Sequence, residues 1–232
     1  MILVSFYLIT FPFSWLFLLS KKTYPAAHYM NRVWGVFVHF FTGLFVYRTG
    51  YKNIKNLEGP VIYVANHTSY LDISSSFLAV PGYFSIIGKA VLGKLPMFGP
   101  MFSKMYITVD RRNKESRLES YKKSLATIES GRSLFFFPEG TIPNHGAPQM
   151  IQFKDGAFKL AIEKQIPIVP VSIPYNWIVL PDSEFLKPRW HLLKYCFHEP
   201  IITKGMTEKD LNTLKGRAFN VIDESIKKHN KL

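Results

Sequence analysis

The chain has 232 residues, enough for one α/β domain with a complete hydrophobic core and too few for two such domains plus a membrane anchor. Its formal net charge of +13 indicates an anionic partner, either a nucleic acid or an anionic membrane surface. The single cysteine excludes an intramolecular disulfide and a thiolate-rich metal site.

The N-terminal segment is apolar. Residues 1–20 carry no charged side chain and are long enough to span a bilayer, although Pro12 interrupts them. A second apolar stretch, residues 33–47, follows a predicted turn around Pro25 and is shorter. These lengths predict an N-terminal membrane-embedded helical hairpin within residues 1–50. A cleavable signal peptide is the alternative, but a basic start and a small-residue cleavage site are missing. An uncharged start together with 16% aromatic residues favours a membrane surface over nucleic acid.

Residues 51–232 have the texture of a single α/β domain, because short β-branched or aromatic runs alternate with amphipathic segments of helix length. Strands are predicted at residues 61–65, 83–87, 106–109, 133–137, 168–173 and 192–197. Helices are predicted at residues 73–80, 91–104, 114–130, 156–164 and 208–228. Strands that alternate with helices predict a mostly parallel central sheet flanked by helices.

A polar segment, residues 66–72, lies directly after the first predicted strand of this domain and before its first predicted helix. His67 and Asp72 are five residues apart, so a turn can fold Asp72 back onto the imidazole. Asp72 would then fix the tautomer of His67 and stabilise the imidazolium, leaving the other ring nitrogen as a general base. The pair alone is a weak signal, since a helix-capping Asp72 and a turn-forming His67 would explain it as well.

A second polar segment, residues 137–141, follows the apolar run that predicts the strand at 133–137. Glu139 and Thr141 would therefore emerge at the carboxyl end of a strand, which is where ligands bind in open α/β sheets. An ordinary Pro-Glu-Gly turn is the alternative.

Four segments, taken together, resemble the motifs of the glycerophospholipid acyltransferase family, specifically the bacterial 1-acyl-glycerol-3-phosphate acyltransferases. The first is NHTSYLD at 66–72, similar to the catalytic NHxSxxD of the family. The others are the acceptor-binding block from GK at 88–89 through LPMFG at 95–99 to VDR at 109–111, FPEGT at 137–141, and IPIVPV at 166–171. They occur in the family's order between residues 61 and 173, so their joint match is specific.

The resemblance implies an enzyme in which His67 deprotonates the hydroxyl of a lysophospholipid acceptor. The hydroxyl then attacks an acyl thioester, acyl-ACP or acyl-CoA, without a covalent acyl-enzyme, so Ser69 is not a nucleophile. Asp72 orients His67. The expected product is phosphatidic acid, made by acylating the sn-2 hydroxyl of 1-acyl-glycerol-3-phosphate.

The resemblance also implies residues that bind the acceptor. Glu139, Gly140 and Thr141 are expected to help hold it. Lys89 and Arg111 are candidates for contact with its phosphate, because a fixed cation makes charge-assisted hydrogen bonds to a phosphate.

One position departs from the family pattern, which usually continues with an arginine after the threonine; here Ile142 stands there. Lys154 is a candidate substitute for the missing cation. A relative that uses a lyso-aminoacyl lipid acceptor is an alternative.

No cofactor, no metal and no nucleic-acid partner are expected, and the expected location is the cytoplasmic face of the cell inner membrane. A non-catalytic membrane lipid-binding protein on the same fold is an alternative. The presence of both His67 and Asp72 argues against it. A nucleic-acid binder would explain the charge but not the uncharged start.

Overall fold

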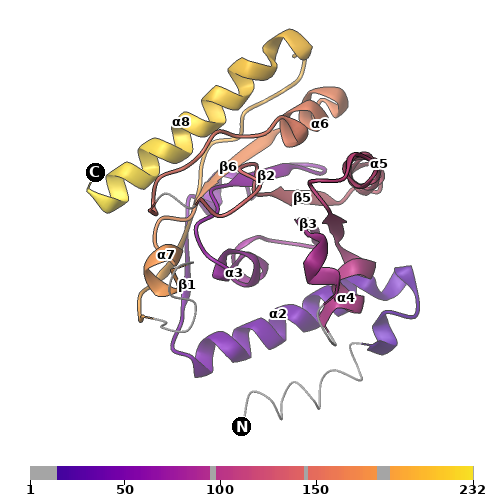
Figure 1. Ribbon diagram of the computed structural model, residues 1–232, viewed down its shortest axis with the longest axis vertical. Coiled ribbons are helices and arrows are strands. Elements are labelled where there is room, and N and C mark those ends of the chain that lie inside the picture. Colours follow the sequence, from indigo (N-terminus) through magenta and orange to yellow (C-terminus); the bar gives the residue numbers. More distant parts are fainter. Residues whose placement is uncertain (1–14, 95–97, 144–145, 182–188, 232) are drawn as a thin grey trace.

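The computed structural model describes residues 15–94, 98–143, 146–181 and 189–231. At its centre lies a seven-stranded sheet with the strand order β1-β7-β6-β2-β5-β3-β4 (Figure 1). Its strands are β1 (Val46–Thr49), β2 (Ile62–Ala65), β3 (Phe84–Lys89), β4 (Ile107–Val109), β5 (Ser133–Phe136), β6 (Ile168–Ser172) and β7 (Leu193–Phe197). Strands β6 and β7 pair antiparallel, and the other neighbouring pairs are parallel. The prediction of a mostly parallel sheet is therefore confirmed.

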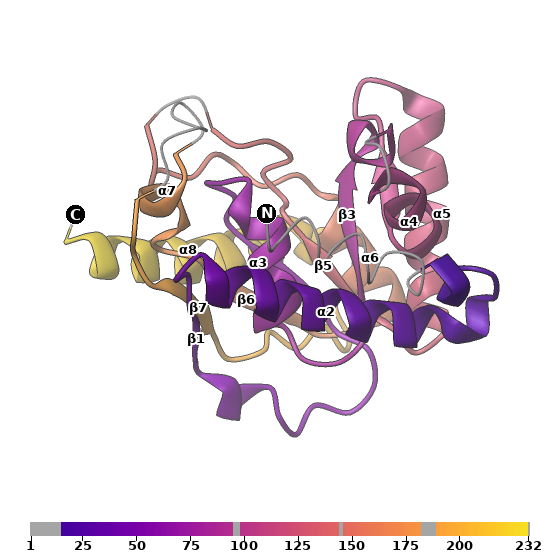
Figure 2. The same cartoon turned by 90° about the horizontal axis from the view of Figure 1, so that it is seen from below.

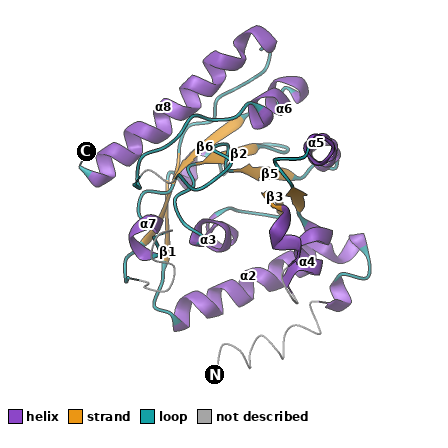
Figure 3. Ribbon diagram, viewed as in Figure 1, coloured by secondary structure: helices purple, strands orange, loops and turns teal. Residues whose placement is uncertain are grey.

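Helices cover both faces of this sheet (Figure 3). One layer contains α2 (Tyr24–Phe41), α3 (Leu71–Ala79) and α4 (Phe98–Met105). The other layer contains α5 (Lys114–Glu129), α6 (Gly156–Lys164) and α8 (Leu211–Asn230). The short helix α7 (Asn176–Val179) follows β6. Single 3-10 turns lie at Lys21–Thr23, Tyr51–Asn53, Ala90–Lys94 and Glu208–Asp210.

Strand β2 shows how the sheet divides the hydrophobic core into two clusters. Tyr63 and Ala65 pack in the cluster under α2, α3 and α4, while Ile62 and Val64 pack in the cluster under α5, α6 and α8. This alternation follows from the two-residue period of a strand. All four side chains are buried, as expected for a strand of a parallel sheet covered on both faces.

Most predicted elements agree with the structure to within two residues. The predicted helix at 208–228 begins three residues later, as α8, after the 3-10 turn Glu208–Asp210. The predicted helix at 91–104 is instead the 3-10 turn Ala90–Lys94 followed by α4, with residues 95–97 outside the described residues. Strand β1 was not predicted. It pairs with β7, so residues 46–49, which precede the predicted domain boundary at residue 50, belong to the sheet.

The N-terminal segment also differs from the prediction. Helix α2 begins at Tyr24, and Pro25 lies in its first turn, so the predicted turn there is wrong. Proline suits a first helical turn because its fixed φ is helical and its missing N–H is not needed there. Helix α2 lies against α3 on the outside of the domain (Figure 2). None of the helices in the described part of the chain is long and apolar enough to cross a bilayer. Because residues 1–14 are outside the described residues, the membrane-embedded hairpin stays a prediction.

Candidate active site

The two polar segments predicted from the sequence meet at one edge of the sheet. Strands β2 and β5 are parallel neighbours, with Val64 opposite Phe136. His67 follows β2 and Glu139 follows β5, so both emerge at the carboxyl edge. The backbone N–H of His67 donates to Glu139 Oε1 at 2.8 Å. Segments 72 residues apart in the chain are thus joined directly.

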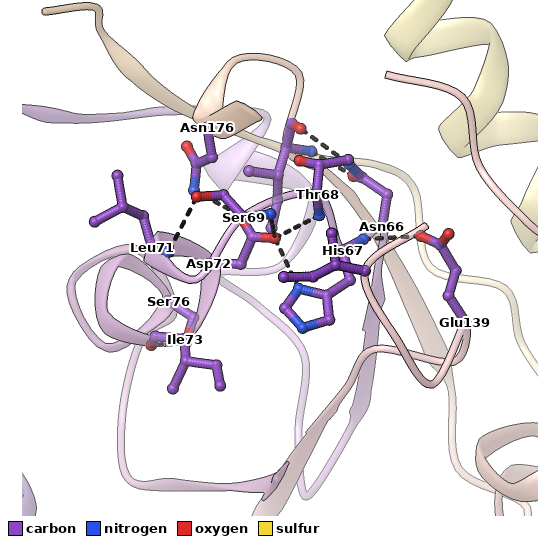
Figure 4. Close-up of polar contacts among 12 residues, drawn as sticks. Asn66, His67, Thr68, Ser69, Leu71, Asp72, Ile73, Ser76, Glu139 and Asn176 are labelled. Atoms are coloured by element: carbon purple, nitrogen blue, oxygen red, sulfur yellow. Dashed lines mark hydrogen bonds and ion pairs between the residues drawn. The ribbon is translucent and has the colours of Figure 1, made fainter. Parts of the chain in front are cut away.

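The turn between β2 and α3 brings the predicted pair together (Figure 4). His67 Nδ1 lies 2.8 Å from Asp72 Oδ2. The same oxygen accepts the backbone N–H groups of Thr68 at 2.7 Å and Ser69 at 2.9 Å. Since α3 begins at Leu71, Asp72 lies in its first turn and closes this loop by bonding to residues that precede it. The local sequence therefore builds the His67–Asp72 contact by itself.

Two residues far along the chain complete the surroundings of Asp72, whose side chain is fully buried. Asn176 Nδ2 donates to Asp72 Oδ1 at 2.8 Å, and the Tyr195 hydroxyl donates to the Asp72 carbonyl oxygen at 3.0 Å. The Asn176 bond lowers the cost of holding the carboxylate away from water, and the Tyr195 bond holds the Asp72 backbone in place. The sequence analysis missed both residues, because neither lies in a recognisable motif near residues 66–72.

The geometry fixes the proton of His67. A carboxylate only accepts hydrogen bonds, so in the neutral imidazole Nδ1 carries the hydrogen and Nε2 carries the lone pair. Among the described residues the hydrogen bond of the His67 ring is made by Nδ1, and Figure 4 shows Nε2 pointing away from Asp72. The ring stacks on Phe137 with a centroid distance of 4.2 Å and an interplanar angle of 22°. The arrangement suits a general base with a fixed tautomer.

Other polar residues of the first segment hold the turn in place. The Ser69 hydroxyl donates to the carbonyl oxygen of Leu180 at 2.8 Å, so its proton is directed away from His67. Asn66 makes paired hydrogen bonds of 2.9 and 2.7 Å with the backbone of Ile173, which follows β6. These contacts fix the turn to the sheet and agree with Ser69 not being a nucleophile.

Glu139 is fully buried, and both of its carboxylate oxygens accept backbone N–H groups, from His67 and, at 3.0 Å, from Ile151. Burial raises the pKa of Glu139 to about 7, and the nearby charge of Asp72 acts in the same direction, whereas the two N–H groups oppose the shift. In the structure Glu139 therefore holds the His67 turn. Its predicted contact with an acceptor stays a prediction.

A pocket of about 480 Å³ opens beside Phe137, between the sheet and helices α5 and α6. It contains the predicted residues Arg111, Gly140 and Lys154, whereas Lys89 and Thr141 are exposed and do not line it. The other lining residues are Ile87, Val109, Arg117, Ser120, Tyr121, Ser124, Phe136, Phe137, Pro138, Gly156 and Ala157. Phe137 also stacks on His67, so a single aromatic ring lies between the pocket and the imidazole.

Gly140 leaves room for the Lys154 side chain in the pocket wall. Its φ of +81° is left-handed, and a Cβ at this position would lie 2.7 Å from Lys154 Nζ. Ile142, which replaces the expected arginine, is buried.

Arg111 offers an unused donor. Burial lowers the pKa of Arg111, and its Nη1 is buried without a hydrogen-bond partner among the described residues. An anion would satisfy this group. Among the described residues no group of three or more His, Cys, Asp or Glu is placed to hold a metal ion.

The chain is similar in sequence to several 1-acyl-sn-glycerol-3-phosphate acyltransferases. The chain is 27% identical over 179 residues to the 1-acyl-sn-glycerol-3-phosphate acyltransferase BAT2 of Brassica napus, which covers 75% of this chain but only 50% of that protein. It is 28% identical over 193 residues to the 1-acyl-sn-glycerol-3-phosphate acyltransferase of Saccharomyces cerevisiae, covering 80% of this chain and 61% of that protein.

The crystal structure of the 1-acyl-sn-glycerophosphate (LPA) acyltransferase PlsC from Thermotoga maritima has the same fold. The TM-score is 0.79 over 99% of this chain and 94% of that chain, with 20% sequence identity. The bacterial subgroup stays a prediction. The family model described as Acyltransferase matches residues 46–174, which include β1, His67, Asp72 and Glu139. As the sequence motifs indicated, the chain belongs to the Acyltransferase family.

Proposed function

We propose that this chain is a 1-acylglycerol-3-phosphate O-acyltransferase, which transfers a fatty acyl group from acyl-ACP or acyl-CoA to the sn-2 hydroxyl of 1-acyl-glycerol-3-phosphate. The observation that carries the proposal is the His67 imidazole, bonded to buried Asp72 and separated by one aromatic ring from a pocket that contains Arg111 and Lys154. The names of the Brassica napus and Saccharomyces cerevisiae relatives support it.

The reaction begins when Nε2 of His67 accepts the proton of the acceptor hydroxyl. The hydroxyl oxygen attacks the carbonyl carbon of the thioester, and a new C–O bond forms. The tetrahedral intermediate collapses by breaking its C–S bond, and the leaving thiolate takes the proton from the imidazolium. Asp72 balances the positive charge of His67 between these steps. No acyl-enzyme forms, since the acceptor itself is the nucleophile.

The acceptor phosphate would bind in the pocket beside Phe137. Arg111 has an unpartnered Nη1 there, and Lys154 lies over Gly140 on the same wall. Charge-assisted hydrogen bonds from these groups would fix the phosphate and so place the sn-2 hydroxyl near His67. Lys89 and Thr141, which are exposed, would contact the acceptor from outside the pocket.

The proposed place of action is the cytoplasmic face of the inner membrane, on anionic lipid. Four apolar side chains of α2 lie at helical spacing on one exposed face, which supports this proposal: Tyr29, Val33, Val36 and Phe40. A net charge of +13 would add electrostatic attraction to anionic lipid. A face of this kind suits attachment in the plane of the membrane interface.

An acyl-transfer assay on purified protein tests the proposal. The donors are acyl-CoA and acyl-ACP in parallel, and the acceptors are lysophosphatidic acid, lysophosphatidylglycerol and a lyso-aminoacyl lipid. Lysophosphatidic acid should be the best acceptor, and a His67→Ala variant is the control. If a lyso-aminoacyl lipid reacts about tenfold faster than lysophosphatidic acid, the acceptor assignment is wrong. Lipid binding without transfer to any acceptor would instead indicate a non-catalytic lipid-binding protein.

A further inference from the structure

Arg117 is a basic residue of the pocket that no sequence motif indicated. It lies in the first half of α5, and its Nη1 donates to the carbonyl oxygen of Arg111 at 2.8 Å. This bond holds the Arg117 guanidinium against the turn after β4, on the pocket wall. A guanidinium has five N–H donors, so four remain for other partners.

The pocket carries an excess of positive charge. Three of the described residues that line the pocket are cationic: Arg111, Arg117 and Lys154. No described lining residue is acidic. The three cationic residues come from the turn after β4, helix α5 and the segment before α6. Three cations around a single space repel one another unless an anion lies between them. The pocket therefore suits a ligand with more than one negative charge.

The start of α6 adds to this potential. Helix α6 begins at Gly156, which lines the pocket with Ala157. The preceding residue, Asp155, does not cap the helix with its side chain, because its carboxylate accepts a hydrogen bond from Lys215 Nζ at 2.7 Å. The Phe158 N–H donates to the Asp155 carbonyl oxygen at 3.0 Å, so within the described residues the N–H groups of Gly156 and Ala157, with the positive end of the helix dipole, are left for a ligand.

We infer that Arg117 is a specificity-determining residue, which contacts the acceptor phosphate together with Arg111 and Lys154 and selects a phosphate monoester over a phosphodiester. The inference rests on the proposed function. A monoester carries up to two negative charges at neutral pH, whereas a phosphodiester such as the headgroup of lysophosphatidylglycerol carries one. Three cations and a helix N-terminus favour the ligand with the larger charge.

The test compares Arg117→Gln with Arg112→Gln, a matched control. Arg112 is exposed and does not line the pocket, and its replacement by glutamine removes the same charge as Arg117→Gln. Arg117→Gln should raise KM for lysophosphatidic acid about tenfold and leave kcat nearly unchanged, because the contact is to a group remote from the reacting atoms. Its KM for lysophosphatidylglycerol should change about twofold or less, and Arg117→Lys should restore part of the loss. Arg112→Gln should resemble the wild type with both acceptors.

A pH series adds a readout that a merely structural role would not move. The second proton of a phosphate monoester binds with a pKa of about 6. The ratio of kcat/KM between the wild type and Arg117→Gln, measured with lysophosphatidic acid, should therefore fall as the pH is lowered from about 7.5 to about 5.5. The ionisation of His67 affects both proteins and cancels in the ratio.

Active wild-type protein, with Arg117→Gln indistinguishable from Arg112→Gln, would overturn this inference and leave the proposed function intact. Equal losses with the monoester and the diester would also overturn it. Wild-type protein that acylates no lysolipid would overturn the proposed function and this inference with it.

Discussion

Glu139 should make folding stability fall as the pH rises through neutrality. Its pKa is raised from 4.5 to about 7, so the folded state holds a proton that the unfolded state releases between these values. The stabilising contribution is complete below pH 4.5 and is lost as the pH rises through about 7. One pKa unit corresponds to about 1.4 kcal/mol, so the total change is about 3 kcal/mol.

A Glu139→Gln variant removes this dependence, because an amide does not titrate. It should also carry a pH-independent cost of about 1–3 kcal/mol, since glutamine can accept from His67 N or from Ile151 N but not from both with its single oxygen. The difference in unfolding free energy between the wild type and Glu139→Gln should therefore change by about 3 kcal/mol between pH 4.5 and pH 8. The wild type should become less stable relative to the variant as the pH rises.

His28 makes this difference, rather than the wild-type curve, the quantity to measure. Burial lowers the pKa of His28 to about 4, so its contribution rises between pH 4 and 6.5 and opposes that of Glu139. Urea unfolding followed by circular dichroism at five pH values gives both curves. Glu58→Gln, at an exposed position, is the control. Parallel curves for the wild type and Glu139→Gln would refute the reasoning.

Three further predictions concern the base and the membrane. His67→Ala should lower kcat by about 10²- to 10⁴-fold with an unchanged circular dichroism spectrum, and a variant that kept half the activity would end the general-base assignment. Asp72→Asn should fold, because Asn176 can turn its buried, unpartnered Oδ1 toward the new amide group, but should lose about tenfold or more in kcat since a neutral amide cannot balance the imidazolium. Val36→Ser with Phe40→Ser should weaken sedimentation with anionic vesicles, whereas Leu118→Ser, also an exposed apolar position, should not; equal binding by both proteins would exclude the α2 face.

The fold was predictable where a segment carries its own signal. The strands at β2, β5 and β6 are apolar runs bounded by polar turns, and α6 has the predicted bounds. Strand β1 was missed because Val46–Thr49 continues an apolar stretch, and its extended conformation depends on pairing with β7, about 147 residues later. Pro25 was read as a turn because proline breaks helices in their interior and starts them at their first turn, and the sequence alone does not say which position it occupies.

The candidate site shows the same division. His67 and Asp72 could be paired from the sequence, since both lie in one short turn. Asn176 and Tyr195 could not, because each reaches the site from a distant part of the chain. Arg117 lies only six residues after Arg111 but belongs to no motif, and the fold of α5 brings it to the pocket. A motif search finds residues that sit together locally. The residues that position these motif residues come from elsewhere in the fold, so only the folded structure identifies them.

The two buried carboxylates of the site differ in what surrounds them, and the difference matches their positions. The Asp72 carboxylate accepts hydrogen bonds from His67, Thr68, Ser69 and Asn176, which stabilise its negative charge beside the His67 imidazole. Glu139 receives two N–H groups, and burial raises its pKa to about 7. Ionised Glu139 is thus a cost in stability near neutral pH. That carboxylate holds the backbone of His67 from the end of β5, so the cost in stability falls at a contact that joins the two polar segments.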